Sequence, residues 1–302
     1  MCVHIQHGWL LRLTVLMAAL SAGLTACGQP ETPAASQTNP PVTTAEPLNV
    51  TVSILPQQYF VERVGGEHVQ VNVMVQPGES PATYEPKPEQ LQALSQAVAY
   101  FRIGVPFENA WMDRIAAANT DMRIVDTTEG IQRRGPPDRP DPHIWLSPRL
   151  VKIQAETIAQ ALAELDPDRA ATYQANLQAF ISDIEALDGE IQTTLAQVTS
   201  RKFMVFHPSW GYFADDYDLE MIPVEVGGQE PGAAELADLI TRAQAEDIHV
   251  VFAQPEFSTR SAETIAQEID GEVLLINPLA ADWLANMRQV AQIFASVLSA
   301  DG

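Results

Sequence analysis

NVTVSILPQQYFVERVGGEHVQVNVMV, residues 49–75, decides how this chain folds. Its two ends, residues 49–54 and 69–75, are rich in β-branched side chains, which favour strands. Between them a helical stretch begins near Pro56, since proline is tolerated in the first turn of a helix. A strand, a helix and a second strand at this spacing indicate two parallel strands joined by a helical crossover.

The same alternation of strands and helices continues along the chain. It favours mainly parallel sheets covered by helices. The predicted fold class is therefore α/β, with two similar lobes of this kind. Further strands are predicted at 98–105, 122–126, 202–207, 219–226, 248–254 and 272–277, and helices at 88–97, 106–118, 232–246, 258–269 and 281–299.

A long helical region separates the two groups of strands. One helix is predicted at about 148–165 and a second at 167–198, interrupted only by Gly189. About 30 helical residues span about 45 Å, enough to join two lobes as a stiff spine. Because glycine lowers local helix stability, two shorter helices broken near Gly189 are the alternative. The predicted division is an N-terminal lobe at 48–166, a linking helix at 167–198 and a C-terminal lobe at 199–302.

The N-terminus has the features of a secretory signal. Residues 1–26 contain Arg12, then an apolar run, then small residues, and the run is too short for a membrane span. LTAC, ending at Cys27, resembles a bacterial lipobox, in which the cysteine carries the lipid; an ordinary cleavage site beside an incidental cysteine is the alternative. Residues 27–47, rich in Pro, Thr, Ser and Ala, predict a lipidated flexible tether. We expect an extracytoplasmic lipoprotein, periplasmic or at the cell surface, attached to the membrane by its lipid alone.

The composition limits the class of protein and its partners. Apolar residues make up 46% of the chain, which favours folded cores over disorder. Lys and Arg number 17 against 39 Asp and Glu, for a formal net charge of −22. So acidic a surface disfavours nucleic acids and anionic membranes as partners.

Two histidines stand in similar local settings. DPHIWLSP (141–148) and VFHPSWGY (205–212) each place a histidine beside a proline and near a tryptophan. His143 lies in a predicted loop and His207 ends a predicted strand, and ligands of such sheets bind where strands end. Two interpretations stay open: both are core histidines, or both are ligands of one metal ion, one from each lobe.

Several stretches resemble the solute-binding proteins of bacterial zinc and manganese ABC importers, the ZnuA-like and TroA-like group. The matching pieces are SILPQQYFVERVGGEHVQVNVMVQPGESPATYEPKP, DPHIWLSP, KFMVFHPSWGYFADDYDL, VVFAQPEFS and INPLA, which cover the chain from about residue 48 to its end. The resemblance implies two α/β lobes bridged by one long helix, with a metal ion bound in the cleft. It also implies that His143 and His207 are metal ligands and that an ABC permease is the partner.

The sequence departs from this family pattern at two places. The family usually has a histidine where PATYEP places Ala82, and an aspartate where NPL places Asn277. Alanine cannot bind a metal, and asparagine offers only a neutral oxygen, a weaker zinc ligand than a carboxylate. Glu256, Glu225 and Asp282 are nearby acids, each with an alternative as a solvated or helix-capping carboxylate. Glu256 follows a predicted strand at the cleft edge and is the best replacement. The predicted metal ligands are His143, His207, Glu256 and Asn277.

The resulting prediction is a lipid-anchored receptor, a monomer without enzymatic activity. It captures Zn²⁺, in preference to Mn²⁺, as a transported ligand and delivers it to the permease. A metal chelate or a small organic solute is the alternative cargo, because Ala82 opens the pocket and Asn277 removes a charge. A metal-dependent hydrolase is a further alternative, although the chain has no HExxH helix and no GxSxG turn.

Overall fold

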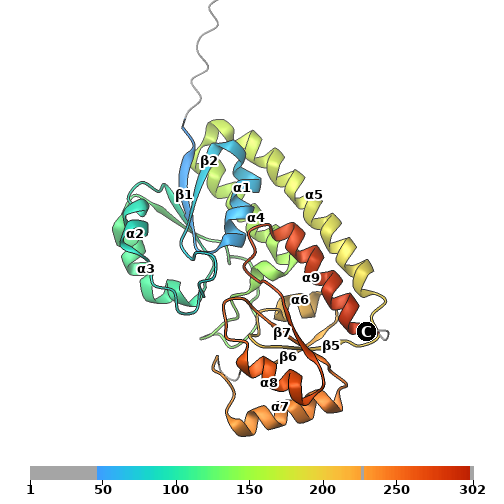
Figure 1. Cartoon of the computed structure of the whole chain (residues 1–302). Helices are drawn as coiled ribbons and strands as arrows, with labels where there is room; N and C mark the ends of the chain where they lie inside the picture. Colours follow the sequence, from blue (N-terminus) through green and yellow to red (C-terminus); the bar gives the residue numbers. More distant parts are fainter. Residues whose placement is uncertain (1–45, 226–227, 300–302) are drawn as a thin grey trace, which may run out of the picture. The chain divides into compact units, whose positions relative to one another are not determined.

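The computed structural model describes residues 46–225 and 228–299 (Figure 1). The predicted signal peptide, Cys27 and nearly all of the predicted tether lie outside these residues. Within the described part, no helix combines the length and the apolar character that crossing a bilayer needs.

The N-terminal half contains a sheet of parallel strands in the order β2-β1-β3-β4. The helices α1 (Leu55–Gly65), α2 (Pro88–Leu94) and α3 (Pro106–Ala118) connect successive strands. Each has proline in its first turn, where the missing N–H removes no helical hydrogen bond. The strands are β1 (Leu48–Val52), β2 (Val69–Val73), β3 (Ala99–Arg102) and β4 (Arg123–Asp126).

The C-terminal half repeats this arrangement in the order β6-β5-β7-β8, again with parallel pairing. The helices α6 (Gly211–Asp216), α7 (Ala233–Ala245) and α8 (Arg260–Glu268) connect its strands. Because the strand order matches that of the first sheet position by position, the two halves share one topology. The predicted α/β class with two similar sheets of parallel strands is confirmed. The strands are β5 (Lys202–Val205), β6 (Glu220–Pro223), β7 (Val250–Ala253) and β8 (Glu272–Leu275).

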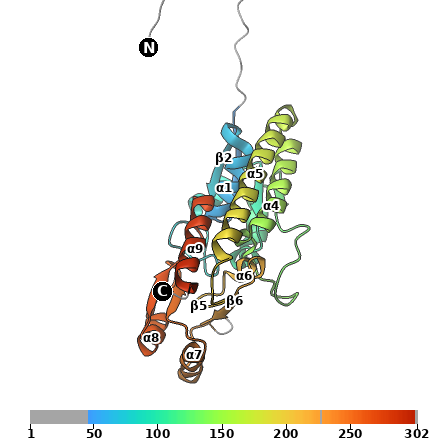
Figure 2. The same ribbon diagram turned by 90° about the vertical axis from the view of Figure 1, so that its right-hand side faces the viewer.

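A long helix, α5 (Ala170–Leu195), connects the two halves (Figures 1 and 2). It packs against α1 and α4 (Pro148–Leu165) and against the last helix, α9 (Trp283–Leu298). It is continuous through Gly189, so the alternative of two helices broken there is wrong. Its buried side chains recur every three or four residues and form one stripe: Tyr173, Leu177, Phe180, Ile184, Leu187, Ile191 and Leu195.

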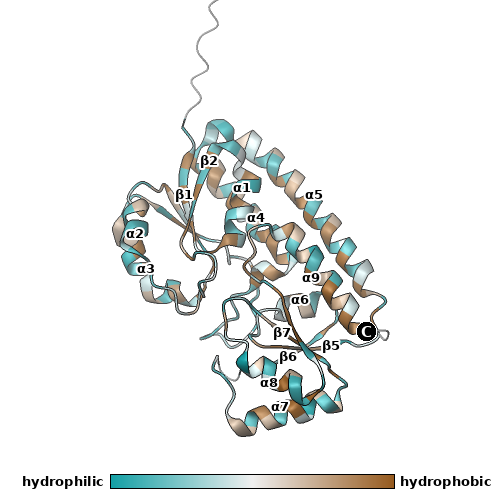
Figure 3. Cartoon of the chain, viewed as in Figure 1, coloured by the Kyte–Doolittle hydropathy of each residue, from teal (hydrophilic) through white to brown (hydrophobic). Residues whose placement is uncertain are grey.

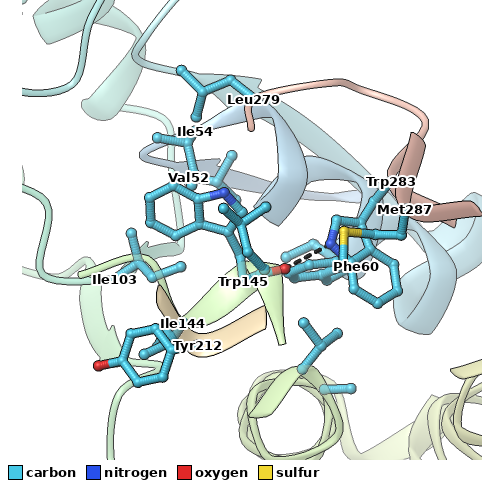
Figure 4. Packing of buried hydrophobic residues seen from close by; sticks show 14 of the residues in the cluster. Val52, Ile54, Phe60, Ile103, Ile144, Trp145, Tyr212, Leu279, Trp283 and Met287 are labelled. Atoms are coloured by element: carbon cyan, nitrogen blue, oxygen red, sulfur yellow. Dashed lines mark hydrogen bonds between the residues drawn. The ribbon is translucent and has the colours of Figure 1, made fainter. Parts of the chain in front are cut away.

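The larger hydrophobic core joins residues from both halves. Helices α5 and α9 alternate between hydrophobic and hydrophilic residues along their length, as expected of helices that bury one face (Figure 3). Trp145 and Trp283 are buried near Phe60 and Ile54 (Figure 4). The Trp283 Nε1–H donates to the backbone carbonyl of Trp145 at 2.6 Å, and the Trp145 Nε1–H donates to the carbonyl of Pro278 at 2.7 Å. The segment that contains Trp145 is thereby attached to the C-terminal residues.

Candidate metal centre

The two histidines come from different kinds of segment. His207 lies just beyond β5, which ends at Val205. His143 immediately precedes a 3-10 turn at Ile144–Leu146, in the loop between β4 and α4. Since β5 is a central strand of its sheet, its carboxyl end is where ligands of parallel sheets bind.

The Asp141 carboxylate orients the His143 ring. Its Oδ1 lies 2.7 Å from Nδ1 of His143 and also accepts the backbone N–H of His143 at 3.0 Å. The side chain of His143 is only 14% exposed. Burial lowers the pKa of His143 and so favours the neutral imidazole that metal binding requires. Burial acts to raise the pKa of Asp141, but the hydrogen bonds and the charge interaction with His143, together with the charge of Arg134, outweigh it, and that pKa is lowered.

The Glu225 carboxylate orients the His207 ring in the same way. Its Oε2 lies 2.6 Å from Nδ1 of His207. The backbone of His207 is held by the side chain of Gln254, which accepts its N–H at 3.1 Å and donates to its carbonyl at 2.7 Å. The ring also stacks on Phe257, with centroids 4.7 Å apart. Both the position and the direction of this imidazole are therefore fixed before any ligand arrives.

The two imidazoles meet through their Nε2 atoms, which lie 3.3 Å apart. A carboxylate beside each Nδ1 favours the proton on that nitrogen. When both rings are neutral, each Nε2 then presents a lone pair to the other. Two lone pairs at this distance repel each other unless a cation lies between them. Two nitrogen ligands in a tetrahedral zinc site, with Zn–N bonds of about 2.0–2.1 Å, are about 3.3–3.4 Å apart. The spacing of His143 and His207 matches that of two nitrogen ligands of one zinc ion.

The histidine pair lines a cavity of ≈ 160 Å³. Glu256 lines the same cavity, and its Oε2 is buried without a hydrogen-bond partner in the described structure. Burial raises the pKa of Glu256, and the neighbouring His207 opposes that rise. A buried, unpaired carboxyl oxygen is a costly feature that a cation would satisfy. The rest of the wall is mostly apolar: Ser80, Pro81, Ala82, Val105, Pro106, Pro142, Trp145, Phe257, Pro278 and Leu279.

The other acids and amides considered from the sequence have structural partners. The Asn277 Oδ1 accepts the backbone N–H of Leu279 at 2.8 Å, and Asn277 lines a neighbouring cavity of ≈ 230 Å³ instead of the one with the histidines. The role of Asn277 as a metal ligand stays a prediction. Asp282 accepts the N–H of Ala285 at 3.1 Å and so caps α9. This agrees with the alternative interpretation of Asp282 as a helix-capping carboxylate.

The structure therefore brings together His143 and His207, with Glu256 on the same wall. Within residues 46–225 and 228–299 it forms no group of three or more His, Cys, Asp or Glu side chains arranged to hold a metal ion. Sequence reasoning missed Asp141 altogether. The sequence did offer a signal, because Asp141 lies two residues before the histidine in DPH. An aspartate side chain commonly accepts the backbone N–H of the residue two positions later.

A second layer of contacts holds the loop of His143 against α6. The Tyr212 hydroxyl accepts the backbone N–H of Arg134 at 2.8 Å and donates to the carbonyl of Asp141 at 2.9 Å. The Arg134 side chain donates to the carbonyl of Gly211 at 3.1 Å and pairs with Asp215. These bonds run from the N-terminal half to the C-terminal half, and they fix Asp141, the carboxylate on which the His143 ring depends.

Two similar α/β halves on one long helix, with a histidine from each half facing a shared cavity, define the class of two-lobed solute-binding proteins. Residues 50–297 match the family described as ZnuA, zinc-uptake complex component A, periplasmic. The chain belongs to this family, which confirms the resemblance noted in the sequence. The family is one of solute-binding proteins and not of enzymes.

Individual relatives agree with this assignment. A crystal structure of ZnuA is 51% identical, covers 84% of this chain and 100% of its own, and superposes with a TM-score of 0.82. A ZnuA deletion mutant with zinc bound is 52% identical, with coverages of 84% and 99% and a TM-score of 0.81. The manganese ABC transporter substrate-binding lipoprotein scaA of Streptococcus gordonii is 27% identical over 276 residues, 85% of this chain and 86% of its own.

Proposed function

We propose that this protein captures a divalent transition metal, zinc in preference to manganese, between His143 and His207 and delivers it to an ABC permease. The observation that carries the proposal is the 3.3 Å separation of the two Nε2 atoms, each on a ring whose Nδ1 faces a carboxylate. A carboxylate behind a ligating histidine fixes its tautomer and raises its basicity.

The donor set favours zinc. Imidazole nitrogen suits zinc, whereas manganese prefers carboxylate, carbonyl and water oxygens. The zinc-bound ZnuA variant, 52% identical to this chain, supports the same choice. The manganese protein of Streptococcus gordonii, at 27% identity, is the more distant of the two.

Glu256 is the proposed third ligand. Its unpaired Oε2 faces no competing hydrogen bond, and its carboxylate would balance one of the two charges of the ion. Asn277 is a weaker proposal, because its oxygen would have to leave the N–H of Leu279 before binding a metal.

The proposed setting is outside the cytoplasm, with the chain held by a lipid on Cys27 and a flexible tether through residue 47. The lipoprotein named among the relatives and the periplasmic description of the family support this setting. We also propose that the protein works as a monomer with lobes at 48–166 and 199–302, linked by the helix of 167–198. The permease would receive the ion from this two-lobed receptor.

Calorimetric titration of the metal-stripped protein with zinc and with manganese tests the proposal. We expect one saturable zinc site of micromolar or tighter affinity and weaker manganese binding. His143→Ala and His207→Ala should each lower zinc affinity by more than about 100-fold, since loss of a supporting residue alone costs 10–100-fold. His249→Ala, a histidine that does not line the cavity, is the matched control. Absence of saturable binding at micromolar metal would remove the proposal.

A further inference from the structure

The residues that line the cavity beside the histidine pair are of two kinds. His143, His207 and Glu256 carry atoms that can bind a metal. Pro81, Ala82, Val105, Pro106 and Leu279 have side chains that offer no hydrogen-bonding atom. An ion bound by the first group would therefore share the cavity with a largely apolar lining.

The number of donors leaves one coordination position of such an ion open. Two imidazoles and the proposed Glu256 carboxylate make three donors, and zinc normally takes four. Ala82, at the cavity wall, contributes only a methyl group. Ser80 is the polar exception in this part of the wall, and its Oγ already accepts the N–H of Ala82 at 3.3 Å.

Water is poorly suited to fill the position. An ordered buried water typically makes two to four hydrogen bonds. Beside the ion it would find few of them, because Pro81, Ala82, Val105, Pro106 and Leu279 carry no side-chain donor or acceptor. The cavity measures ≈ 160 Å³. In another protein, an apolar cavity of about 150 Å³ admits benzene. A five-membered aromatic ring is smaller still, so it can enter together with a bare ion.

We propose that the metal is captured as a complex with an exogenous small molecule whose imidazole-type nitrogen supplies the fourth bond. The ring of this molecule lies against Ala82, Val105 and Pro106, and its neutral nitrogen gives a lone pair to the ion without any proton transfer. This rests on the proposed function, because it requires His143 and His207 to bind the ion.

Zinc titrations with and without imidazole test the inference. With imidazole at about ten times its dissociation constant for the zinc-loaded protein, apparent zinc affinity should rise about tenfold. Ala82→Leu adds bulk to the cavity wall and should abolish the gain. Thr83→Leu, the same new side chain at the next, exposed residue outside the cavity, should keep it. Free imidazole also binds zinc in solution and lowers the concentration of free zinc. This loss is the same for both variants, because both are measured in the same solution. The difference between their affinities therefore reports binding at the cavity.

Two measurements on the wild type make the test independent of how well the variants fold. Native mass spectrometry should detect protein, zinc and imidazole in one complex. The visible absorption of the Co²⁺-loaded protein should shift when imidazole is added, because a donor atom of the metal changes. Zinc binding that is indifferent to imidazole, or an equal gain in Ala82→Leu, overturns the inference and leaves the proposed function standing. Absence of zinc binding under all conditions overturns both.

Discussion

His143 and His207 reach the same cavity by different routes. His143 takes its carboxylate from Asp141, two residues earlier in the same loop, and the same oxygen accepts its backbone N–H. His207 takes its carboxylate from Glu225, 18 residues later, beyond a neighbouring strand. Glu225 is placed there because its N–H donates to the carbonyl of Phe206, which continues the pairing of β6 with β5. One half of the site is encoded locally, and the other depends on the pairing of strands.

The contacts that hold the backbone of each histidine also differ between the two halves. His207 is held on both its N–H and its carbonyl by one buried side chain, Gln254, from the end of β7. The loop of His143 is held by Tyr212 and Arg134, which bridge to α6. Damage to the C-terminal sheet should therefore affect His207 directly, whereas His143 should respond to changes in its own loop and in α6.

Outside the two histidines themselves, the largest effect on zinc affinity is expected at the two carboxylates. Asp141→Asn and Glu225→Gln keep an acceptor oxygen but remove the charge, so each should lower zinc affinity about 10–100-fold. Calorimetry, or competition with a chelator of known affinity, measures the change. Glu164→Gln, on the exposed surface of α4, is the control and should leave the affinity unchanged. Wild-type affinity in both carboxylate variants would contradict the orienting role.

The next prediction distinguishes a loss of stability from a loss of zinc affinity. Gln57 and Gln254 are both fully buried glutamines that bond backbone groups near strand ends, one in each half. Leucine at either position leaves those groups unpaired, which should lower the free energy of unfolding by about 1–3 kcal/mol. Chemical denaturation measures this loss. Only Gln254→Leu should also weaken zinc binding. Equal weakening by Gln57→Leu would show that affinity simply follows stability.

Acid should weaken zinc binding, because protons compete with the metal for the two Nε2 atoms. The fall is at most about tenfold per pH unit for each proton displaced. Burial lowers the pKa of His143 from its ordinary value of 6.5, so its contribution to the fall begins below that pH. Zinc titrations between about pH 8 and pH 5 measure the slope. An affinity that stayed constant over this range would argue against ligation by imidazole.

The smallest effect is expected at Asp282. Because its carboxylate caps α9, Asp282→Ala should lower the free energy of unfolding by about 0.5–2 kcal/mol. It should leave zinc affinity unchanged. Thermal unfolding and a zinc titration of the same sample check both statements. A clear loss of zinc affinity would return Asp282 to the set of candidate ligands.

Most of the fold could be predicted, because strand and helix signals alternate regularly. The continuity of α5 at Gly189 could not be decided from propensity. Gly189 costs the helix about 1 kcal/mol relative to alanine. The buried stripe on both sides of it, including Leu187 and Ile191, packs against neighbouring helices and compensates. Such tertiary packing is not visible in a local pattern.

The site was predictable only in part. His143 and His207 stood out by their neighbours in the sequence, and Asp141 was within reach of the same inspection. The contact of Glu225 with His207 depends on strand order and register, which a single sequence does not specify. Glu256 is a candidate because its Oε2 is buried without a hydrogen-bond partner in the described structure. That burial depends on residues distant in the sequence that line the same cavity, so it could not be predicted from the sequence.

The indole N–H groups of Trp145 and Trp283 couple the loop of His143 to the C-terminal residues. Trp283 in turn packs edge-on against Phe60 of α1, in the N-terminal half, with ring centroids 5.3 Å apart. The loop of His143 is thereby attached to residues of both halves. A substitution in α9 that shifts Trp283 should therefore also displace the loop that carries a candidate metal ligand.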